Sequence, residues 1–284
     1  MAIIFLCSCQ SNQEDEEVVT EQEVLSEMDD LSTSPFGSQK FMWVFQDDFT
    51  AKQKEKLKNW IIEVGEATIQ TIGQYPFDVE IVFHKSSRGG NKAVTFGHTD
   101  RGKVQGVHFY VNPDRPYNEF IEDWTAPHEI SHLSAPFVGK KFKWFAEGYA
   151  TYLSRKIMIT MNQFTQEEFD EMYTKRIVAS LKFYDSSTKT HAEISDSLLS
   201  QHIYGDMYWG SASYFYTADK ELEKKFSISL SSVITKYQDC CRLKDKNVHM
   251  MVKSLDEIVG DKLFYNLFDK YVNQPSSVAM QPYM

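Results

Sequence analysis

The stretch HEISHLSAPFVGKKFKWFAEG, residues 128–148, decides how the folded part of this 284-residue chain is read. His128 and His132 are four residues apart. On a helix such residues project from one face, one turn above the other, so both imidazoles can reach a single ion. Glu147 follows His132 by fifteen residues. The turn-like segments 135–136 and 139–140 give the chain room to reverse and enter a second helix that packs against the first.

Glu129 lies beside the first histidine and is rotated from it by about 100° on a helix. Its carboxylate therefore points next to the ion, where it can accept a proton from an activated water molecule. The pattern H-E-x-x-H is the zinc-protease signature for this reason. A catalytic zinc needs three protein ligands and an open fourth position. Glu147 is the candidate third ligand of one Zn²⁺ ion, beside His128 and His132.

The segments around this stretch indicate an α+β fold. Residues 40–115 are rich in expected strands, at 41–45, 79–84, 93–98 and 104–111, with one helix at 50–73. The residues at 100–102 predict a hairpin between the last two strands. The remainder, 116–284, is expected to be helical, at 118–134, 144–158, 165–184, 196–224, 227–240 and 254–272. A strand-rich first part followed by helices places a sheet on one side of a helical body.

Composition and charge exclude several classes of protein. The hydrophobic content of 42%, with 14% aromatic residues, is ample for a globular core. No apolar run approaches the roughly 18 residues of a membrane-spanning helix. Nine acidic residues lie between Glu14 and Asp30, and removing them from the formal charge of −10 leaves −1. The rest of the chain thus has no basic surplus of the kind that nucleic-acid binding requires.

The N-terminal sequence MAIIFLCSC resembles a bacterial lipobox, in which Cys9 would carry the lipid. This resemblance implies a signal peptide over 1–9. Residues 10–39 are rich in acidic and polar side chains and bury too little surface to fold, so we expect an acidic flexible tether there. The zinc metallopeptidase domain that the H-E-x-x-H motif indicates would then span 40–284. The lipobox resemblance also implies an extracytoplasmic protein anchored to the bacterial outer membrane. The acidic run after Cys9 resembles the export signals of surface-exposed lipoproteins. The start lacks a positive n-region and has an h-region of only about five residues, so a cytosolic start and a true translation start further upstream both stay open.

The other cysteines predict no disulfide framework. Cys240 and Cys241 are adjacent, which is a poor geometry for bridging each other, and Cys7 lies with Cys9 near the N-terminus. The redox compartment cannot be read from these four residues.

The residues 128–132, followed by WFAEGYATYL at 144–153, resemble the gluzincin zinc metallopeptidases. The likeness is to the aminopeptidase N and glycyl aminopeptidase branches, whose pattern is H-E-x-x-H followed by W-L-x-E-G-x-x-x-Y. It implies a thermolysin-like catalytic domain, with a small mixed N-terminal sheet and a mainly helical C-terminal half. It also implies zinc held by His128, His132 and Glu147, with Glu129 as general base. The gap before Glu147 is shorter than in typical members, and no G-x-M-E-N segment is present, so endopeptidase and aminopeptidase action both stay open.

In the resembling families a tyrosine from a later helix stabilises the oxyanion. The segment YGDMYWGSA at 204–212 occupies the comparable place. Tyr208 is the first candidate and Tyr204 the second, and His202 is a third because some gluzincins use histidine. An ordinary helical aromatic is the alternative interpretation of Tyr208.

Three histidines and two arginines in the first half are further candidates. His84, His98 and His108 are interpreted as strand residues that face solvent or the cleft rim. Arg101 and Arg115 could receive a substrate carboxylate, and nothing in the sequence selects between them.

The leading hypothesis is a lipid-anchored zinc peptidase that hydrolyses peptide or protein substrates outside the cytoplasm. A second hypothesis is a binding lipoprotein that keeps the fold and the zinc without hydrolysis, against which the intact Glu129 argues. A third is a structural zinc that joins two helices. Carboxylate ligation by only three protein ligands argues against it, since structural zinc usually has four Cys or His ligands.

Overall fold

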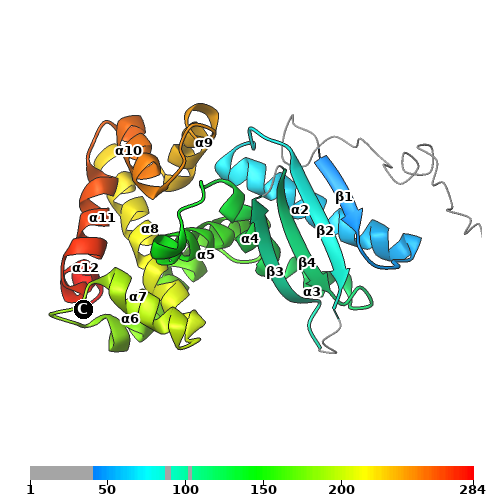
Figure 1. The fold of residues 1–284 in the computed structure, drawn as a ribbon, viewed down its shortest axis with the longest axis horizontal. Coiled ribbons are helices and arrows are strands. Elements are labelled where there is room, and N and C mark those ends of the chain that lie inside the picture. Colours follow the sequence, from blue (N-terminus) through cyan, green and yellow to red (C-terminus); the bar gives the residue numbers. More distant parts are fainter. Residues whose placement is uncertain (1–40, 87–90, 102–103) are drawn as a thin grey trace, which may run out of the picture. The chain divides into compact units, whose positions relative to one another are not determined.

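The computed structural model describes residues 41–86, 91–101 and 104–284. The predictions for 1–9 and 10–39, including lipidation of Cys9, lie outside these residues. The described part has an α+β fold, as predicted: a small mixed sheet comes first, and helices make up the rest (Figure 1). None of the helices in these ranges combines the length and apolar character needed to cross a bilayer.

The sheet has four strands in the order β1-β2-β4-β3. These strands are β1 (Phe41–Phe45), β2 (Val79–Lys85), β3 (Val94–Arg101) and β4 (Gln105–Val111). β2 pairs in parallel with β1 and β4, whereas β3 and β4 pair antiparallel, which confirms the predicted hairpin. β3 is therefore an edge strand, with one side free of any strand partner in the described sheet.

Helix α2 (Ala51–Ile72) covers one face of this sheet (Figure 1). It begins at a capping box, in which Thr50 and Gln53 bond each other's backbone N–H groups. Alternate strand residues and one side of α2 form a buried core around Trp60. The opposite alternation places His84, His98 and His108 on the other face of the sheet, where all three are partly buried.

The helices that follow the sheet are more numerous than the sequence predicts. They are α3 (Tyr117–Ile121), α4 (Thr125–Leu133), η1 (Lys140–Phe142), α5 (Lys143–Thr160), α6 (Gln166–Tyr184), α7 (His191–Ser200), α8 (Tyr204–Phe226), α9 (Leu230–Cys240), α10 (Val248–Val259), α11 (Leu263–Asn273), α12 (Ser276–Met280) and η2 (Gln281–Tyr283).

Three predicted helices are each two helices, and each break has a local cause. Between α3 and α4, the side chain of Asp123 accepts a hydrogen bond from the backbone N–H of Thr125 at 2.7 Å. Between α7 and α8, His202 takes a left-handed conformation with φ +60°. Gly260 ends α10 in the same region, with φ +74°. The predictions of single helices over 118–134, 196–224 and 254–272 were therefore wrong.

A disulfide joins Cys240 to Cys241, so the expectation that these neighbours would not bridge was wrong as well. The bond lies where α9 ends. There Cys241 leaves helical geometry, with φ −131° and ψ −29°, and so its side chain is no longer fixed by the helix to point away from Cys240.

Two hydrophobic cores meet at helices α4 and α5. Helix α4 packs Ile130 and Leu133 into the core beneath the sheet. The first turns of α5 instead pack Trp144, Phe145 and Tyr149 into a larger, aromatic core formed by the later helices. The two helices also contact each other, so α4 and α5 connect the sheet to the helical body.

Candidate metal centre

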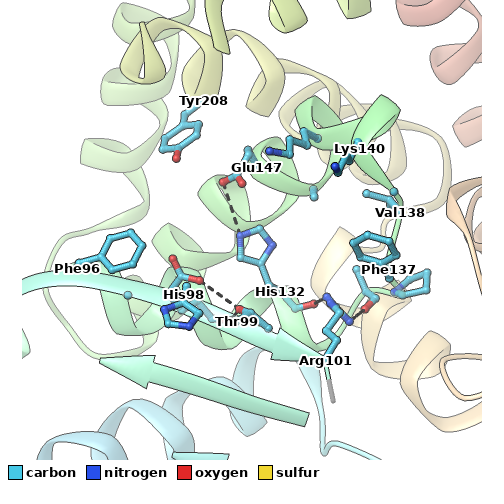
Figure 2. Close-up of a pocket in the computed structure, with 17 residues that line it drawn as sticks. Phe96, His98, Thr99, Arg101, His132, Phe137, Val138, Lys140, Glu147 and Tyr208 are labelled. Atoms are coloured by element: carbon cyan, nitrogen blue, oxygen red, sulfur yellow. Dashed lines mark hydrogen bonds and ion pairs between the residues drawn. The ribbon is translucent and has the colours of Figure 1, made fainter. Parts of the chain in front are cut away.

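His128, His132 and Glu147 converge at the contact between α4 and α5. His128 Nε2 lies 3.2 Å from Glu147 Oε2, and His132 Nε2 lies 3.6 Å from the same oxygen. One potential ligand atom from each residue lies within 4.8 Å of the other two. Figure 2 shows His132 and Glu147 pointing toward each other from their two helices. The spacing seen in the sequence thus places three candidate ligands around one point.

The three side chains are largely withdrawn from water. His128 is only 3% exposed. Burial alone would raise the pKa of Glu147, but hydrogen bonds from His128 and His132 lower it well below its usual range. Burial lowers the pKa of His132, yet the hydrogen bond and charge of Glu147 outweigh this and raise it. The carboxylate is therefore ionised and ready to serve as a ligand.

This donor set fits a divalent metal ion. Two imidazole nitrogens and one carboxylate oxygen are a common catalytic zinc set, and such a site keeps a further position for substrate or water. In the described part of the chain, no fourth His, Cys, Asp or Glu joins this group of candidate ligands. The group could hold a metal ion, with ligands of the type that zinc accepts.

Glu129 lies beside this group, at the side where β3 passes α4. The single hydroxyl proton of Thr99 is shared between the carbonyl oxygen of Glu129, 2.9 Å from Oγ1, and Glu129 Oε2, 3.1 Å from it. The hydroxyl from the edge strand therefore helps to orient the carboxylate without neutralising it. Both Thr99 and Glu129 line a cleft of about 410 Å³.

Side chains from distant parts of the chain hold the carbonyl groups at the end of α4. Arg101 donates to the carbonyl oxygen of His132 at 2.5 Å and to that of Ala135 at 2.9 Å. Arg242 Nε donates to the carbonyl oxygen of Leu133 at 2.9 Å. Burial, reinforced by the nearby charge of Arg242, lowers the pKa of Arg101 to about 10. These two cations lie at the C-terminus of α4, the negative end of its dipole, and therefore also stabilise the helix.

The sequence does not predict this arrangement, because it offers Arg101 and Arg115 only as receptors for a substrate carboxylate. In the structure Arg115 instead pairs with Glu119 one turn later, with Nε donating at 2.8 Å. Arg242 was not singled out at all, because 109 residues separate it from its partner Leu133.

Of the three candidate oxyanion donors, the structure brings only Tyr208 to the cleft. Tyr208 lines the cleft, and its ring centroid lies 5.7 Å from that of His128. Burial, with the charges of Glu147 and Glu129, raises the pKa of Tyr208 above its usual value. Tyr204 is 42% exposed, and its hydroxyl bonds His202 Nδ1 at 2.6 Å. Neither Tyr204 nor His202 lines the cleft.

The three strand histidines form a row on the face of the sheet opposite α2. His84 Nε2 lies 2.9 Å from His108 Nδ1, and the rings of His98 and His108 stack at 4.6 Å. Of the three, His98 also lines the cleft. Burial lowers the pKa of all three, which favours neutral rings.

No family model matches this chain, and no curated protein matches it either. The likeness to gluzincins therefore depends on the motif residues in α4 and α5, and what those residues can do must be argued from their geometry.

Proposed function

We propose that the protein is a zinc-dependent peptidase of the gluzincin type, anchored outside the cytoplasm by a lipid on Cys9. The observation that carries the catalytic part is the convergence of His128, His132 and Glu147, with Glu129 beside them at the floor of a cleft. The lipobox-like N-terminus supports the anchor and an outer-membrane location. The thermolysin-like arrangement implied by the resemblance belongs to this proposal.

When bound, the metal would polarise the scissile carbonyl and lower the pKa of water toward neutrality. Glu129 takes the proton from the attacking water and passes it to the departing amine. Thr99 holds the Glu129 carboxylate in place for both transfers. The hydroxyl of Tyr208 donates a hydrogen bond to the developing oxyanion, a contribution worth about 3 kcal/mol in comparable sites.

The edge strand supplies a route for the substrate. Gly97, His98 and Thr99 of β3 line the cleft directly beside Glu129. A peptide in extended conformation can add to such an edge through backbone hydrogen bonds, so that its scissile bond crosses the metal site. The cleft therefore suits a peptide or protein substrate better than a compact small molecule.

Metal analysis and a cleavage assay on matched proteins test this function. Wild type and Glu129→Gln are loaded with zinc, and their metal content is measured beside their cleavage of casein and of a peptide library. We expect equal zinc in both and a loss of at least 100-fold in cleavage by Glu129→Gln, since general acid–base groups contribute about that much or more. Zinc in both proteins with no cleavage by wild type would favour the non-catalytic binding lipoprotein.

A further inference from the structure

The two ends of the cleft differ in chemistry. Figure 2 shows Phe96 and Tyr208 on one side of His132, and Phe137, Val138 and Lys140 on the other. Apart from Glu129, the lining at the first end is aromatic or polar without formal charge. The second end is formed by the connection between α4 and α5, where the Phe137 side chain is 66% exposed.

Three cations line this cleft, Arg101, Lys140 and Lys143, and Figure 2 shows the first two on the same side as Phe137. Arg101 already binds two carbonyl oxygens of the chain. Lys140 and Lys143 are exposed, and no described residue forms a hydrogen bond with either ammonium group or an ion pair within 4.0 Å. Burial raises the pKa of Asp196 in α7, and the charges of Lys141 and Lys143 partly offset this, although neither lysine forms an ion pair with it within 4.0 Å. Two ammonium groups therefore stay available beside the metal centre.

We propose that Lys140 and Lys143, with the exposed ring of Phe137, form a subsite that binds a carboxylate of the substrate. This inference rests on the proposed peptidase function and names a preference within it. The ammonium groups would attract the carboxylate, and the Phe137 ring would cover the apolar stem of the same residue.

The direction of β3 indicates where on the substrate that carboxylate lies. β3 runs from Val94 to Arg101, and Arg101 bonds Ala135, at the start of the connection that leads to the two lysines. Antiparallel pairing, the commoner arrangement of neighbouring strands, would place the substrate residues before the scissile bond at that end. The expected ligand is therefore an Asp or Glu side chain on the N-terminal side of the cleaved bond. The same charges would repel a free α-amine there, which disfavours aminopeptidase action.

Matched peptides and charge-reversal variants test the subsite. Quenched fluorescent decapeptides carry Asp or Asn at one position at a time, with a free or an amidated C-terminus. Wild type should cleave the best Asp peptide about tenfold faster in kcat/KM than its Asn partner, as expected for two partly exposed ion pairs. Lys140→Glu/Lys143→Glu should abolish or invert that ratio, and raised salt should reduce it in wild type.

Lys141→Glu is the control, because Lys141 lies in the same short helix η1 but does not line the cleft. It should keep the wild-type ratio. Equal loss of the ratio in Lys141→Glu would show a general charge effect and overturn the subsite.

Binding to zinc-loaded Glu129→Gln, measured by fluorescence anisotropy with the same peptides, separates the subsite from the hydrolysis. If kcat/KM is the same for the Asp and Asn peptides, in wild type and in the lysine variants, the subsite is overturned. The proposed peptidase function would not be affected by that result. Charge-dependent binding without cleavage by wild type would support the subsite and contradict the peptidase. Dependence on the free C-terminus alone would support the subsite and reverse the substrate's direction.

Discussion

Gly97 in β3 lies so close to Glu129 in α4 that a β-carbon on residue 97 would sit 2.8 Å from Cγ of Glu129. The same β-carbon would lie 2.9 Å from Cγ2 of Thr125. Real β-carbons essentially never approach other atoms so closely. The edge strand and the proposed general base therefore fit together only because residue 97 has no side chain.

Gly97→Ala should impair catalysis while leaving the metal in place. The added methyl group pushes the Glu129 carboxylate from its position beside the metal centre, and a displacement of about 1 Å can cost about 100-fold in rate. We expect kcat/KM to fall by between ten- and 100-fold with unchanged zinc stoichiometry. Gly106→Ala on the neighbouring strand is the control, because its β-carbon would make ordinary contacts from 3.4 Å outward. Loss of zinc in Gly97→Ala would point to a wider disruption of α4.

Arg242→Met should destabilise the end of the metal-bearing helix. It removes the donor to the Leu133 carbonyl oxygen and leaves a buried acceptor unpaired, which costs about 1–3 kcal/mol. Urea denaturation of the metal-free protein measures the change, and zinc titration should show weaker binding because His132 precedes Leu133. Lys175→Met, on the exposed side of α6, should change neither quantity. A zinc affinity equal to wild type in Arg242→Met would show that Arg101 alone suffices to position His132.

Gly148→Ala should separate α5 from α8. Its β-carbon would lie 2.5 Å from the carbonyl oxygen of Ser211 and 3.0 Å from the amide nitrogen of Ala212. These are backbone atoms of a packed helix, so the helices must move apart, at a cost of about 1–3 kcal/mol in the free energy of unfolding. Gly205→Ala near the start of α8 meets no atom within 4 Å and should be neutral or slightly stabilising. Chemical denaturation of the two variants measures the difference, and equal stability would contradict the close packing.

The stability of the fold should fall in mild acid because of His191. This side chain is fully buried against Tyr184 and Tyr271, and burial lowers its pKa to about 3. In the unfolded chain it takes up a proton near its ordinary pKa of about 6.5. Protonation thus favours unfolding, and the free energy of unfolding should decrease as pH falls from about 6.5 toward 3, by up to about 1.4 kcal/mol per pH unit. His191→Phe should remove this part of the slope, measured by urea denaturation in EDTA at pH 7.5 and 5.0.

The local part of the candidate site was predictable from the sequence. His128, His132 and Glu129 sit on one short helix, where spacing alone determines their directions. Glu147 required the further inference that the chain reverses between the two helices, and the structure shows that reversal. The sequence ranked Tyr208 before Tyr204 as the oxyanion donor, and the structure brings only Tyr208 to the cleft. The distinction depends on where α8 begins, which the left-handed residue His202 fixes.

The rest depends on contacts between distant segments. Arg101 lies 31 residues from His132 in the sequence, and Arg242 lies 109 from Leu133, so no local pattern connects them. The break between α3 and α4 was missed because apolar spacing continues through it, whereas the hydrogen bond at Asp123 ends the first helix. Adjacent cysteines usually have a poor geometry for a disulfide. The sequence does not show that the backbone leaves helical geometry at Cys241, which allows the bond between Cys240 and Cys241.

Zinc should stabilise the protein strongly, and Glu147→Ala should lose that effect. At 100 times its dissociation constant, a ligand specific to the folded state adds about 2.7 kcal/mol to the free energy of unfolding. Denaturation with and without zinc measures this gain. A Glu147→Ala variant that gains as much as wild type would show that zinc binds elsewhere.

The three ligands come from two helices, so a bound ion would stabilise the contact between those helices. Two of the ligands belong to a helix packed under the sheet, and the third to the first turns of α5, which pack in the aromatic core. A bound ion would therefore add a cross-link to the contacts that α4 and α5 already make. Amide hydrogen exchange should then be slower in both helices in the zinc-loaded protein than after a chelator has removed the ion.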